Sequence, residues 1–339
     1  MNTHKAGLLT GVGLCSLAAT LFLVGFLVGL LVACGRYAHF ALPEVRGGDA
    51  SLVFRFLEQP GPVLVRGEFR DVLNPSVVVS GRALAPVPVN FYSVFDGHTW
   101  HTAEAIGDRR LGIVLSPDPK TWEGGYIAAN GSALFVQNGL AIWYWYVAGP
   151  RDRPRIGLAK QAGEKLWHKE PAPVLELGPS GSWDERAVAD PYVIRVEPYF
   201  YMYYLGQDRA ARQRIGVARS RDGIHWEKLR ANPIVEMDED EAGIGEPAVW
   251  QSHGFYWMLY TVRDFAENRC LRLARSTDGV RWTKLAVRYR GTQSWDSKVL
   301  CDPTVVVDGE RILVWFGGGD VASPDENLHG QIGFATLAK

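Results

Sequence analysis

The sequence has almost no excess of one charge. Its 36 lysine and arginine residues are balanced by 37 aspartates and glutamates, giving a formal charge of −1 at pH 7. Nucleic-acid-binding domains carry a basic patch or stripe, so no nucleic-acid partner is expected. Cysteine is scarce, with 4 residues in 339, and their spacing gives neither a disulfide framework nor a metal site. Cys270 and Cys301 are expected to be small buried side chains, with a bridge between them as the alternative.

Several catalytic signatures are missing as well. The sequence contains no glycine-rich phosphate loop, no Ser/His/Asp signature and no zinc-binding pattern. Residues 50–339 also lack an amphipathic stretch of helical period and useful length. Their short segments are rich in Val, Ile, Tyr, Phe and Trp and are broken by Asp-Gly or Pro turns, which is typical of β-strands. This region is therefore expected to be all-β.

The N-terminal segment has a different composition. Residues 6–33 contain no charged residue and are dominated by Leu, Val, Gly, Ala and Phe. About 20 apolar residues can cross the ~30 Å hydrocarbon core of a bilayer, whereas a cleaved signal peptide has a shorter apolar region. Residues 1–36 are therefore expected to be a membrane anchor that enters the bilayer through residues 7–33. The sequence Leu-Val-Ala-Cys-Gly at 31–35 also resembles a bacterial lipobox, so lipidation at Cys34 is an alternative.

Five segments that each begin with a polar residue recur along the rest of the chain. Their first residues are spaced 56, 60, 56 and 56 residues apart. Most are followed by an aromatic run, a further short strand and a Ser-to-Trp element, which in two repeats reads Ser-x-Asp-Gly-x-x-Trp. The segments begin at Asn74, Asn130, Asp190, Glu246 and Asp302.

A repeat of about 50 residues with roughly four strands is typical of a β-propeller blade. The five repeats predict a five-bladed β-propeller over residues 52–339, preceded by a linker at 37–51. The last repeat lacks an outermost strand, and we expect Leu52–Leu57 to supply it and close the ring. Equivalent positions of the repeat surround the propeller axis, so the five polar residues are expected to share one central cavity. The aromatic runs are expected to pack between blades.

Over roughly residues 52–338 the repeats resemble the five-bladed propeller glycosidases, which include family 43 arabinanases and xylosidases and family 32 invertases. The resemblance lies in an acid followed by proline on the inner strand, an aromatic strand and the Ser-x-Asp-Gly-x-x-Trp turn. In that group, three carboxylates from consecutive blades act in the order Asp, Asp, Glu. The resemblance implies that Glu246 is the general acid and that Asp190 stabilises the transition state and tunes the acid.

The catalytic pattern is only partly kept. Asn130 stands where the resemblance places the nucleophile or base, and an amide has no anionic oxygen for either role. The preceding blade offers Asn74, which is also neutral, and the following blade offers Asp302. Glycoside cleavage requires a second carboxylate beside the acid. If the protein is active, Asp302 or Asp190 must supply the base, so the predicted catalytic residues are Glu246, Asp190 and Asp302.

Further residues are predicted to bind substrate. Two Ser-Trp-Asp segments each lie six residues before an inner-strand acid, where the Trp can pack on a sugar face and the Asp can bind hydroxyls; a structural loop latch is the alternative. Arg214 recurs before the third strand, with counterparts at Arg155 and Arg269. No cofactor is expected, although a structural calcium ion at the axis, near His329, is an option that the resemblance allows. The predicted binding residues are Asn74, Asn130, Trp183, Asp184, Trp295, Asp296 and Arg214.

Two main functional hypotheses follow. In the first, the protein is a membrane-tethered glycosidase whose partner is an oligo- or polysaccharide. In the second, it is a carbohydrate-binding propeller that has lost its nucleophile, as Asn130 suggests. A propeller used only for protein partners is a third hypothesis, and it predicts a pocket filled by side chains. Because polymers are degraded outside cells, the propeller is expected at the cell surface or in the periplasm.

Overall fold

The computed structural model describes residues 37–79, 87–107, 109–136, 141–163 and 166–339. The predicted anchor, residues 1–36, lies outside this part of the chain. Within the described residues, no helix combines the length and the apolar character needed to cross a membrane.

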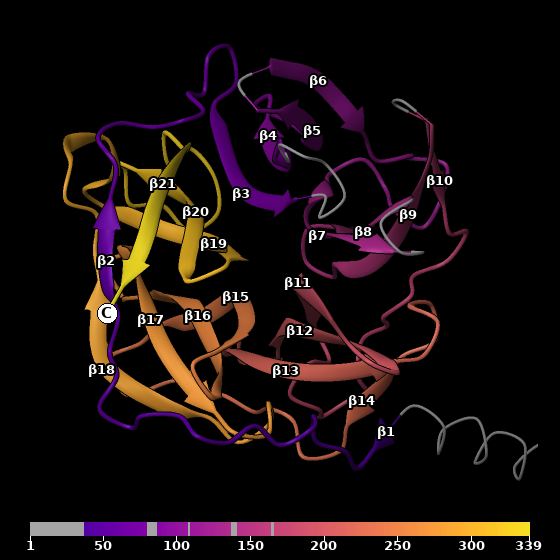
Figure 1. Cartoon of the computed structure of the whole chain (residues 1–339). Helices are drawn as coiled ribbons and strands as arrows, with labels where there is room; N and C mark the ends of the chain where they lie inside the picture. Colours follow the sequence, from indigo (N-terminus) through magenta and orange to yellow (C-terminus); the bar gives the residue numbers. More distant parts are fainter. Residues whose placement is uncertain (1–36, 80–86, 108, 137–140, 164–165) are drawn as a thin grey trace, which may run out of the picture.

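Five antiparallel sheets are arranged around a central axis (Figure 1), which confirms the predicted five-bladed β-propeller. One strand of each blade lies at the axis, and each of these inner strands packs against the next until β19 packs against β3. A short 3-10 helix, η2 (Ser294–Asp296), precedes β19. The blades are β3 (Asp71–Val78), β4 (Val89–Phe95), β5 (Trp100–Ile106) and β6 (Arg109–Leu115); β7 (Ala128–Val136), β8 (Ala141–Ala148), β9 (Arg155–Gly163) and β10 (Leu166–Lys169); β11 (Ala187–Val196), β12 (Tyr199–Gln207), β13 (Gln213–Ser220) and β14 (Glu227–Leu229); β15 (Gly243–Ser252), β16 (Phe255–Arg263), β17 (Arg269–Ser276) and β18 (Thr283–Tyr289); and β19 (Val299–Asp308), β20 (Arg311–Gly319), β21 (Gln331–Ala338) and β2 (Arg55–Glu58).

The fifth blade is completed by an early strand. β2 pairs antiparallel with β21 from Arg55 opposite Ala338 to Glu58 opposite Ala335, so the predicted donor segment is confirmed. Just before β2, the Phe54 side chain is 2% exposed, and its carbonyl accepts a hydrogen bond from the Tyr289 hydroxyl of blade four at 2.5 Å. Joining the two ends of the chain in one sheet removes an exposed strand edge.

Residues 37–51, expected from the sequence to be a linker, pack against the propeller. β1 (Tyr37–Ala38) adds a parallel strand to β14, and the segment then runs past blade four to β2 (Figure 1). Leu42 is 3% exposed, and its N–H donates to the carbonyl of Asp278 at 2.8 Å. Phe40 and Val45 pack on the same apolar cluster between blades three and four. The apolar side chains in this segment explain why it adheres to the blades.

Large aromatic side chains fill the spaces between blades, as predicted. Tyr203, Trp257 and Tyr260 are all fully buried. In the Ser-x-Asp-Gly-x-x-Trp turns, the indole N–H groups of Trp226 and Trp282 donate to the carbonyls of Gly223 and Gly279. The turns are therefore structural elements, held by hydrogen bonds within each turn. Cys270 and Cys301 are buried free thiols, so no bridge joins them.

Candidate active site

The five repeated polar residues share an unusual backbone conformation. Each has a positive φ, between 46° and 52°, and each lies where the pairing of its inner strand with the second strand skips residues. Such a β-bulge turns a side chain away from the regular alternation of the strand. The left-handed conformation costs a non-glycine residue roughly 1–2 kcal/mol, and such strain clusters at functional sites. The residues are Asn74, Asn130, Asp190, Glu246 and Asp302.

The residue after each bulge explains why the sequence motif recurs. Four of the five polar residues are followed by proline, which has no N–H to leave unpaired where the ladder is interrupted. In blade two, glycine takes this place at Gly131. A Cβ there would lie 2.4 Å from the carbonyl oxygen of Trp145, so a larger residue would displace the neighbouring strand. The acid-proline pattern is therefore the sequence signature of the bulge.

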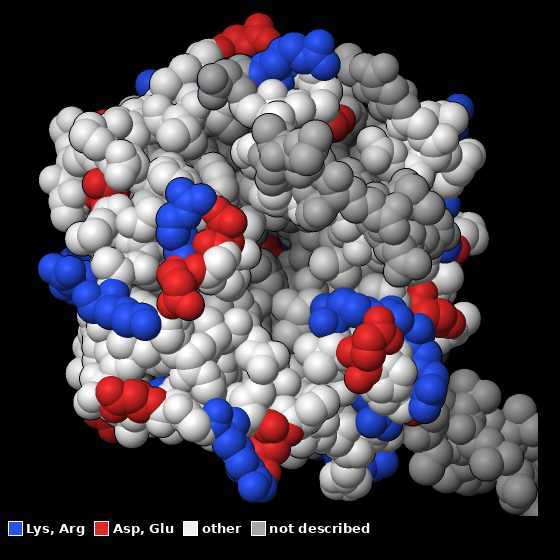
Figure 2. Space-filling model, in the orientation of Figure 1, with Lys and Arg blue, Asp and Glu red and all other residues white. Residues whose placement is uncertain are grey.

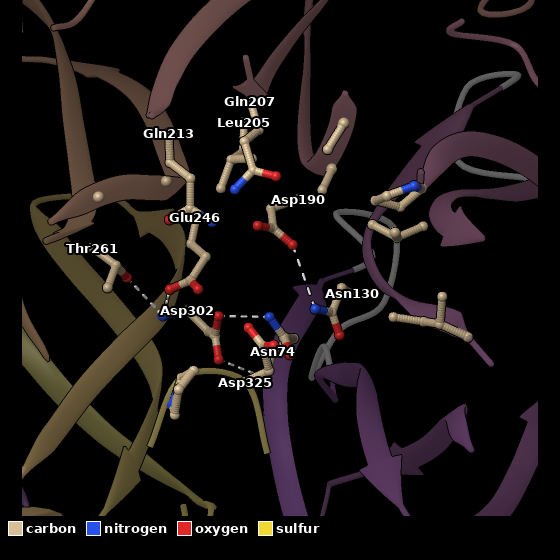
Figure 3. Close-up of a pocket in the computed structure, with 18 of the residues that line it drawn as sticks. Asn74, Asn130, Asp190, Leu205, Gln207, Gln213, Glu246, Thr261, Asp302 and Asp325 are labelled. Atoms are coloured by element: carbon tan, nitrogen blue, oxygen red, sulfur yellow. Dashed lines mark hydrogen bonds between the residues drawn. The ribbon is translucent and has the colours of Figure 1, made fainter. Parts of the chain in front are cut away.

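The five bulges converge on a pocket of about 430 Å³ on one face of the propeller. The pocket appears as a hollow near the centre of this face in Figure 2. All three predicted catalytic carboxylates line it, together with the amides of Asn74 and Asn130 (Figure 3). The pocket is open rather than filled by side chains, unlike the expectation for a propeller that serves only protein partners.

Asp302 and Glu246 form a closely coupled pair. The backbone N–H of Asp302 donates to Oε2 of Glu246 at 3.1 Å and also to the Thr261 hydroxyl at 3.1 Å. Burial raises the pKa of Asp302 well above its usual range, and the neighbouring charge of Glu246 and a hydrogen bond between the two carboxyl groups raise it further. Crowding of two carboxyl groups disfavours the state in which both are charged. The Asp302 carboxyl group therefore favours its protonated form more than a free aspartate does.

The two asparagines are hydrogen-bond donors to the carboxylates. Nδ2 of Asn74 donates to Asp302 at 2.6 Å, and its backbone N–H donates to the same carboxylate at 3.3 Å. Nδ2 of Asn130 donates to Asp190 at 3.4 Å, while its Oδ1 accepts from the Ser93 hydroxyl at 2.9 Å. A carboxylate in place of either amide would add a negative charge beside existing ones, so the asparagines relieve charge repulsion in the ring.

Asp190 has a strongly perturbed titration. Burial raises its pKa to about 7, and the charge of Glu246 adds to the effect, whereas the hydrogen bond from Asn130 and the charge of Arg269 lower it. A carboxyl group with a pKa near 7 is present in both protonation states at physiological pH. That property suits a group that exchanges protons or adjusts the charge of a neighbouring acid.

The Asp190 shift predicts how stability responds to pH. The folded-state pKa, about 7, lies above the usual value of 3.8, so the folded protein holds more protons than the unfolded chain between these values and loses stability as pH rises through them. Asp190→Asn should therefore gain stability relative to the parent at pH 8 and show little difference at pH 4. Urea unfolding at both values, with exposed Asp152→Asn as the control, measures this; a difference independent of pH would contradict it.

Five of the predicted substrate-binding residues lie outside the central pocket. Asp184 and Asp296 are both 0% exposed; Asp184 is buried in an ion pair with Lys228. The Trp183 ring packs over Gly206 and Gly216 of its own blade, and Trp295 packs similarly on Gly318 and Gly333. These four residues do not line the central pocket, and the alternative of a repeated loop latch fits their burial; their contact with substrate stays a prediction. The latch residues are Trp183, Asp184, Trp295 and Asp296.

Arg214 is the fifth of these residues. It is 7% exposed and donates to Asp208 at 2.6 Å, and it does not line the central pocket. Its counterpart Arg155 packs over the Trp122 ring at 5.3 Å. Arg269, in contrast, does line the pocket and donates to the carbonyl of Ser323 at 3.2 Å. The three arginines occupy equivalent positions of the repeat, but among them only Arg269 lines the central pocket.

Sequence reasoning missed two carboxylates that line the pocket, Asp152 and Asp325. Asp325 lies on residues 320–330, which connect β20 to β21, and its side chain is 59% exposed. The equivalent connections in blades three and four are shorter, at 208–212 and 264–268. The extra length of the blade-five connection is the only sequence signal that could have indicated it, because its path across the pocket depends on tertiary contacts.

The described axis residues offer few oxygen ligands for a calcium ion. Among them, Glu246, Cys301 and Asp302 bring ligand atoms within 4.8 Å of one another, but Ca²⁺ takes 6–8 oxygen ligands and one of these atoms is a thiol sulfur. The positively charged Arg269 interacts with all three groups. His329 pairs with Asp320 at 2.8 Å and does not line the pocket. We therefore derive no step that uses a metal ion.

The chain was compared with protein-family models, with curated sequences and with solved structures. No protein-family model matches the chain. An uncharacterized protein of Mycobacterium tuberculosis, present in two strains, is 27% identical over 223 residues, which cover 61% of this chain and 74% of that protein. A solved structure of a glycoside hydrolase has a TM-score of 0.66 at 18% identity and covers 83% of this chain and 92% of its own. A thermostable family-43 glycoside hydrolase has a TM-score of 0.58 at 16% identity and covers 78% and 88%.

At these identities, the structural similarity establishes the fold. The chain has the five-bladed propeller fold found in glycoside hydrolases, and the resemblance predicted from its repeats is confirmed at that level.

Proposed function

We propose that the protein hydrolyses a glycosidic bond of an oligo- or polysaccharide in the central pocket. The observation that carries the proposal is the convergence of Asp190, Glu246 and Asp302 from three successive blades on one open pocket. Glycoside hydrolysis needs a carboxylic acid that holds its proton near neutral pH and a second carboxylate within reach of the same bond. The raised pKa values support the proposal: burial raises the pKa of Asp190 to about 7 and raises that of Asp302 well above its usual range, which favours their protonated forms.

Glu246 is the proposed general acid. It is half-buried and faces the pocket, whereas Asp302 lies behind it with 5% exposure. A proton shared by the pair can therefore reach a leaving oxygen through Glu246, while Asp302 fixes the orientation of the Glu246 carboxyl group. Asp190 adjusts the charge around the acid, and Arg269 offsets negative charge at the wall of the pocket.

A second function is a carbohydrate-binding propeller without catalysis. The amide at Asn130 favours this alternative because the inner strand of blade two offers no nucleophile or base. The two functions differ in a direct way: a binding protein retains an oligosaccharide unchanged, whereas a hydrolase releases a new reducing end.

We also propose that residues 1–36 tether the propeller to a membrane and place it outside the cytoplasm. The uncharged run at 6–33 supports this proposal. Fractionation of cells that express the full chain, compared with a chain that starts at Tyr37, tests it. Equal recovery of both chains in the soluble fraction would contradict the tether.

The experiment that tests the catalytic proposal is a screen of aryl glycosides that covers arabinosides, xylosides, fructosides and mannosides. We expect the parent protein to release the aryl group from at least one of them and Glu246→Gln to release almost none. Equal release by both proteins would exclude this site as the catalyst. If neither protein cleaves any substrate but both retain oligosaccharides on a glycan array, the binding alternative is supported instead.

A further inference from the structure

This inference rests on the proposed function and concerns the carboxylate that works with Glu246. The acid and its partner must flank the scissile bond, at about 5 Å from each other for retention or about 6.5–9.5 Å for inversion. Asp302 cannot be that partner because its N–H and its carboxyl group are both hydrogen-bonded to Glu246, which leaves no room for a sugar between them. Asn130 cannot be the partner because it carries no charge.

Asp190 belongs to the same ring of residues as Glu246, and its carboxylate accepts a hydrogen bond from the Asn130 amide at 3.4 Å. Burial raises its pKa to about 7, and the charge of Glu246 is the next largest cause, so the two groups lie close together and Asp190 keeps the role of adjusting the acid. The base of an inverting reaction needs a water molecule between itself and the sugar. A carboxylate that faces solvent at the edge of the ring provides that room.

Asp325 meets these requirements. It lines the pocket, and its side chain is 59% exposed. It forms an ion pair at 3.2 Å with Arg151, which also lines the pocket. Figure 3 draws it among the residues that line the pocket, together with Asn74 and Asp302. Its charge also contributes to the raised pKa of Asp190, which indicates that it acts on the same space as the ring carboxylates.

The loop that carries Asp325 is fixed to blade one by a buried carboxylate. Asp71 is 0% exposed and accepts three backbone N–H groups of the loop, from Asn327 at 2.6 Å, Leu328 at 2.9 Å and Gly330 at 2.8 Å. Hydrogen bonds to a charged group are stronger than those between neutral groups. The connection between β20 and β21 is thus held across the junction between the first and last blades.

The two neighbours of Asp325 are anchored as well. Arg269 donates to the carbonyl of Pro324 at 2.5 Å, and the Tyr126 hydroxyl donates to Glu326 at 2.6 Å. Asp325 therefore projects from a backbone that is held on one side by β17 of blade four and on the other by the segment that leads into β7 of blade two. A side chain placed this firmly can act at a defined point of the pocket despite its exposure.

We propose that Asp325 is the general base of an inverting hydrolysis. A water molecule attacks the anomeric carbon and gives its proton to the Asp325 carboxylate, while Glu246 gives its proton to the leaving oxygen. The bond from the anomeric carbon to the water oxygen forms as the glycosidic bond breaks. The base that the repeat lacks at Asn130 is thus supplied from the connection between β20 and β21.

Asp308 provides a matched control for this proposal. It is an exposed aspartate that pairs with an arginine, Arg311, as Asp325 pairs with Arg151, but it does not line the pocket. On the substrate found in the screen, Asp325→Asn should lower kcat at least ~10²-fold, as expected for loss of a general base. Asp308→Asn should leave kcat within about twofold. Melting curves verify that both variants fold.

Two further readouts separate a catalytic role from a structural one. Sodium azide should restore turnover of an activated aryl glycoside by Asp325→Asn and yield a glycosyl azide, because azide attacks without needing a base. Proton NMR of the parent reaction should show a first-formed sugar of inverted configuration. A retained configuration, or Asp325→Asn with parental kcat while Glu246→Gln is inactive, would overturn the role of Asp325 and leave the hydrolase intact. An inert parent protein would remove both proposals.

Discussion

Glu246→Gln is expected to lower kcat for glycoside cleavage by roughly 10²–10⁴-fold, the usual contribution of a general acid. Glutamine has nearly the same shape, and its side-chain oxygen can still accept the hydrogen bond that Asp302 donates through its backbone N–H. It has no acidic proton to give to the leaving oxygen. Steady-state kinetics should therefore show a loss in kcat with little change in KM, since the pocket keeps its shape.

A leaving group that needs no protonation makes the test sharper. Glycosides with a highly acidic phenol should lose much less activity in Glu246→Gln than those with an alkyl leaving group. The control is Glu267→Gln, the same chemical change on the turn after β16, where Glu267 pairs with Arg263 at 2.8 Å. If both variants lose kcat equally, or if Glu246→Gln loses the same factor on every leaving group, Glu246 is not the acid.

The same variant changes the charge balance of the ring. Glu246 is a cause of the raised pKa values of both Asp190 and Asp302, so removing its charge should lower both. The folded protein would then hold fewer excess protons, and its stability should fall less steeply as pH rises towards neutrality. The proposed catalysis and the stability of the fold thus depend on the same repulsion between the carboxyl groups of Asp190, Glu246 and Asp302, as is usual at a functional site.

The ring of polar residues could be predicted because a repeat fixes its geometry. Once five units of similar length are recognised, equivalent residues must surround the axis, and Asp190, Glu246 and Asp302 do so. The direction of their side chains depends on the bulge, which the following proline signals locally. The repeat spacing and the proline after each bulge are both visible in the sequence, so these features of the site could be predicted from it.

Four predicted binding residues lie outside the central pocket because their place in the structure depends on contacts that are not local in sequence. The two Ser-Trp-Asp segments looked like a pocket rim because they precede inner strands, but burial decides their role. Asp184 is joined to Lys228, 44 residues further along the chain. Asp325 was missed for the same reason, since long-range contacts such as those of Asp71 and Arg269 hold its loop at the pocket. Pairwise contacts of this kind cannot be derived from the spacing of a repeat.

Asp184→Asn is expected to destabilise the protein by about 3–5 kcal/mol, the cost of removing one partner of a buried ion pair. The Asp184 carboxylate accepts hydrogen bonds from Lys228 at 2.5 Å and from the Tyr204 hydroxyl at 3.2 Å. With asparagine, the Lys228 ammonium, which is 5% exposed, loses the carboxylate charge beside it but still donates to the Glu176 carbonyl at 2.7 Å. Urea unfolding at pH 6 measures the loss, and KM for a cleaved substrate should stay unchanged in the folded variant.

The equivalent change in blade five should have the opposite effect on stability. Asp296 occupies the same place in the repeat, but burial raises its pKa to about 7 from the usual 3.8. Among the described residues, Asp296 forms no ion pair with a buried lysine of the kind that Asp184 forms with Lys228. A carboxyl group with a raised folded-state pKa loses stability as pH rises through that window, so Asp296→Asn should gain stability relative to the parent between pH 6 and pH 8. Equal losses for Asp184→Asn and Asp296→Asn would show that the lysine does not distinguish the two latches.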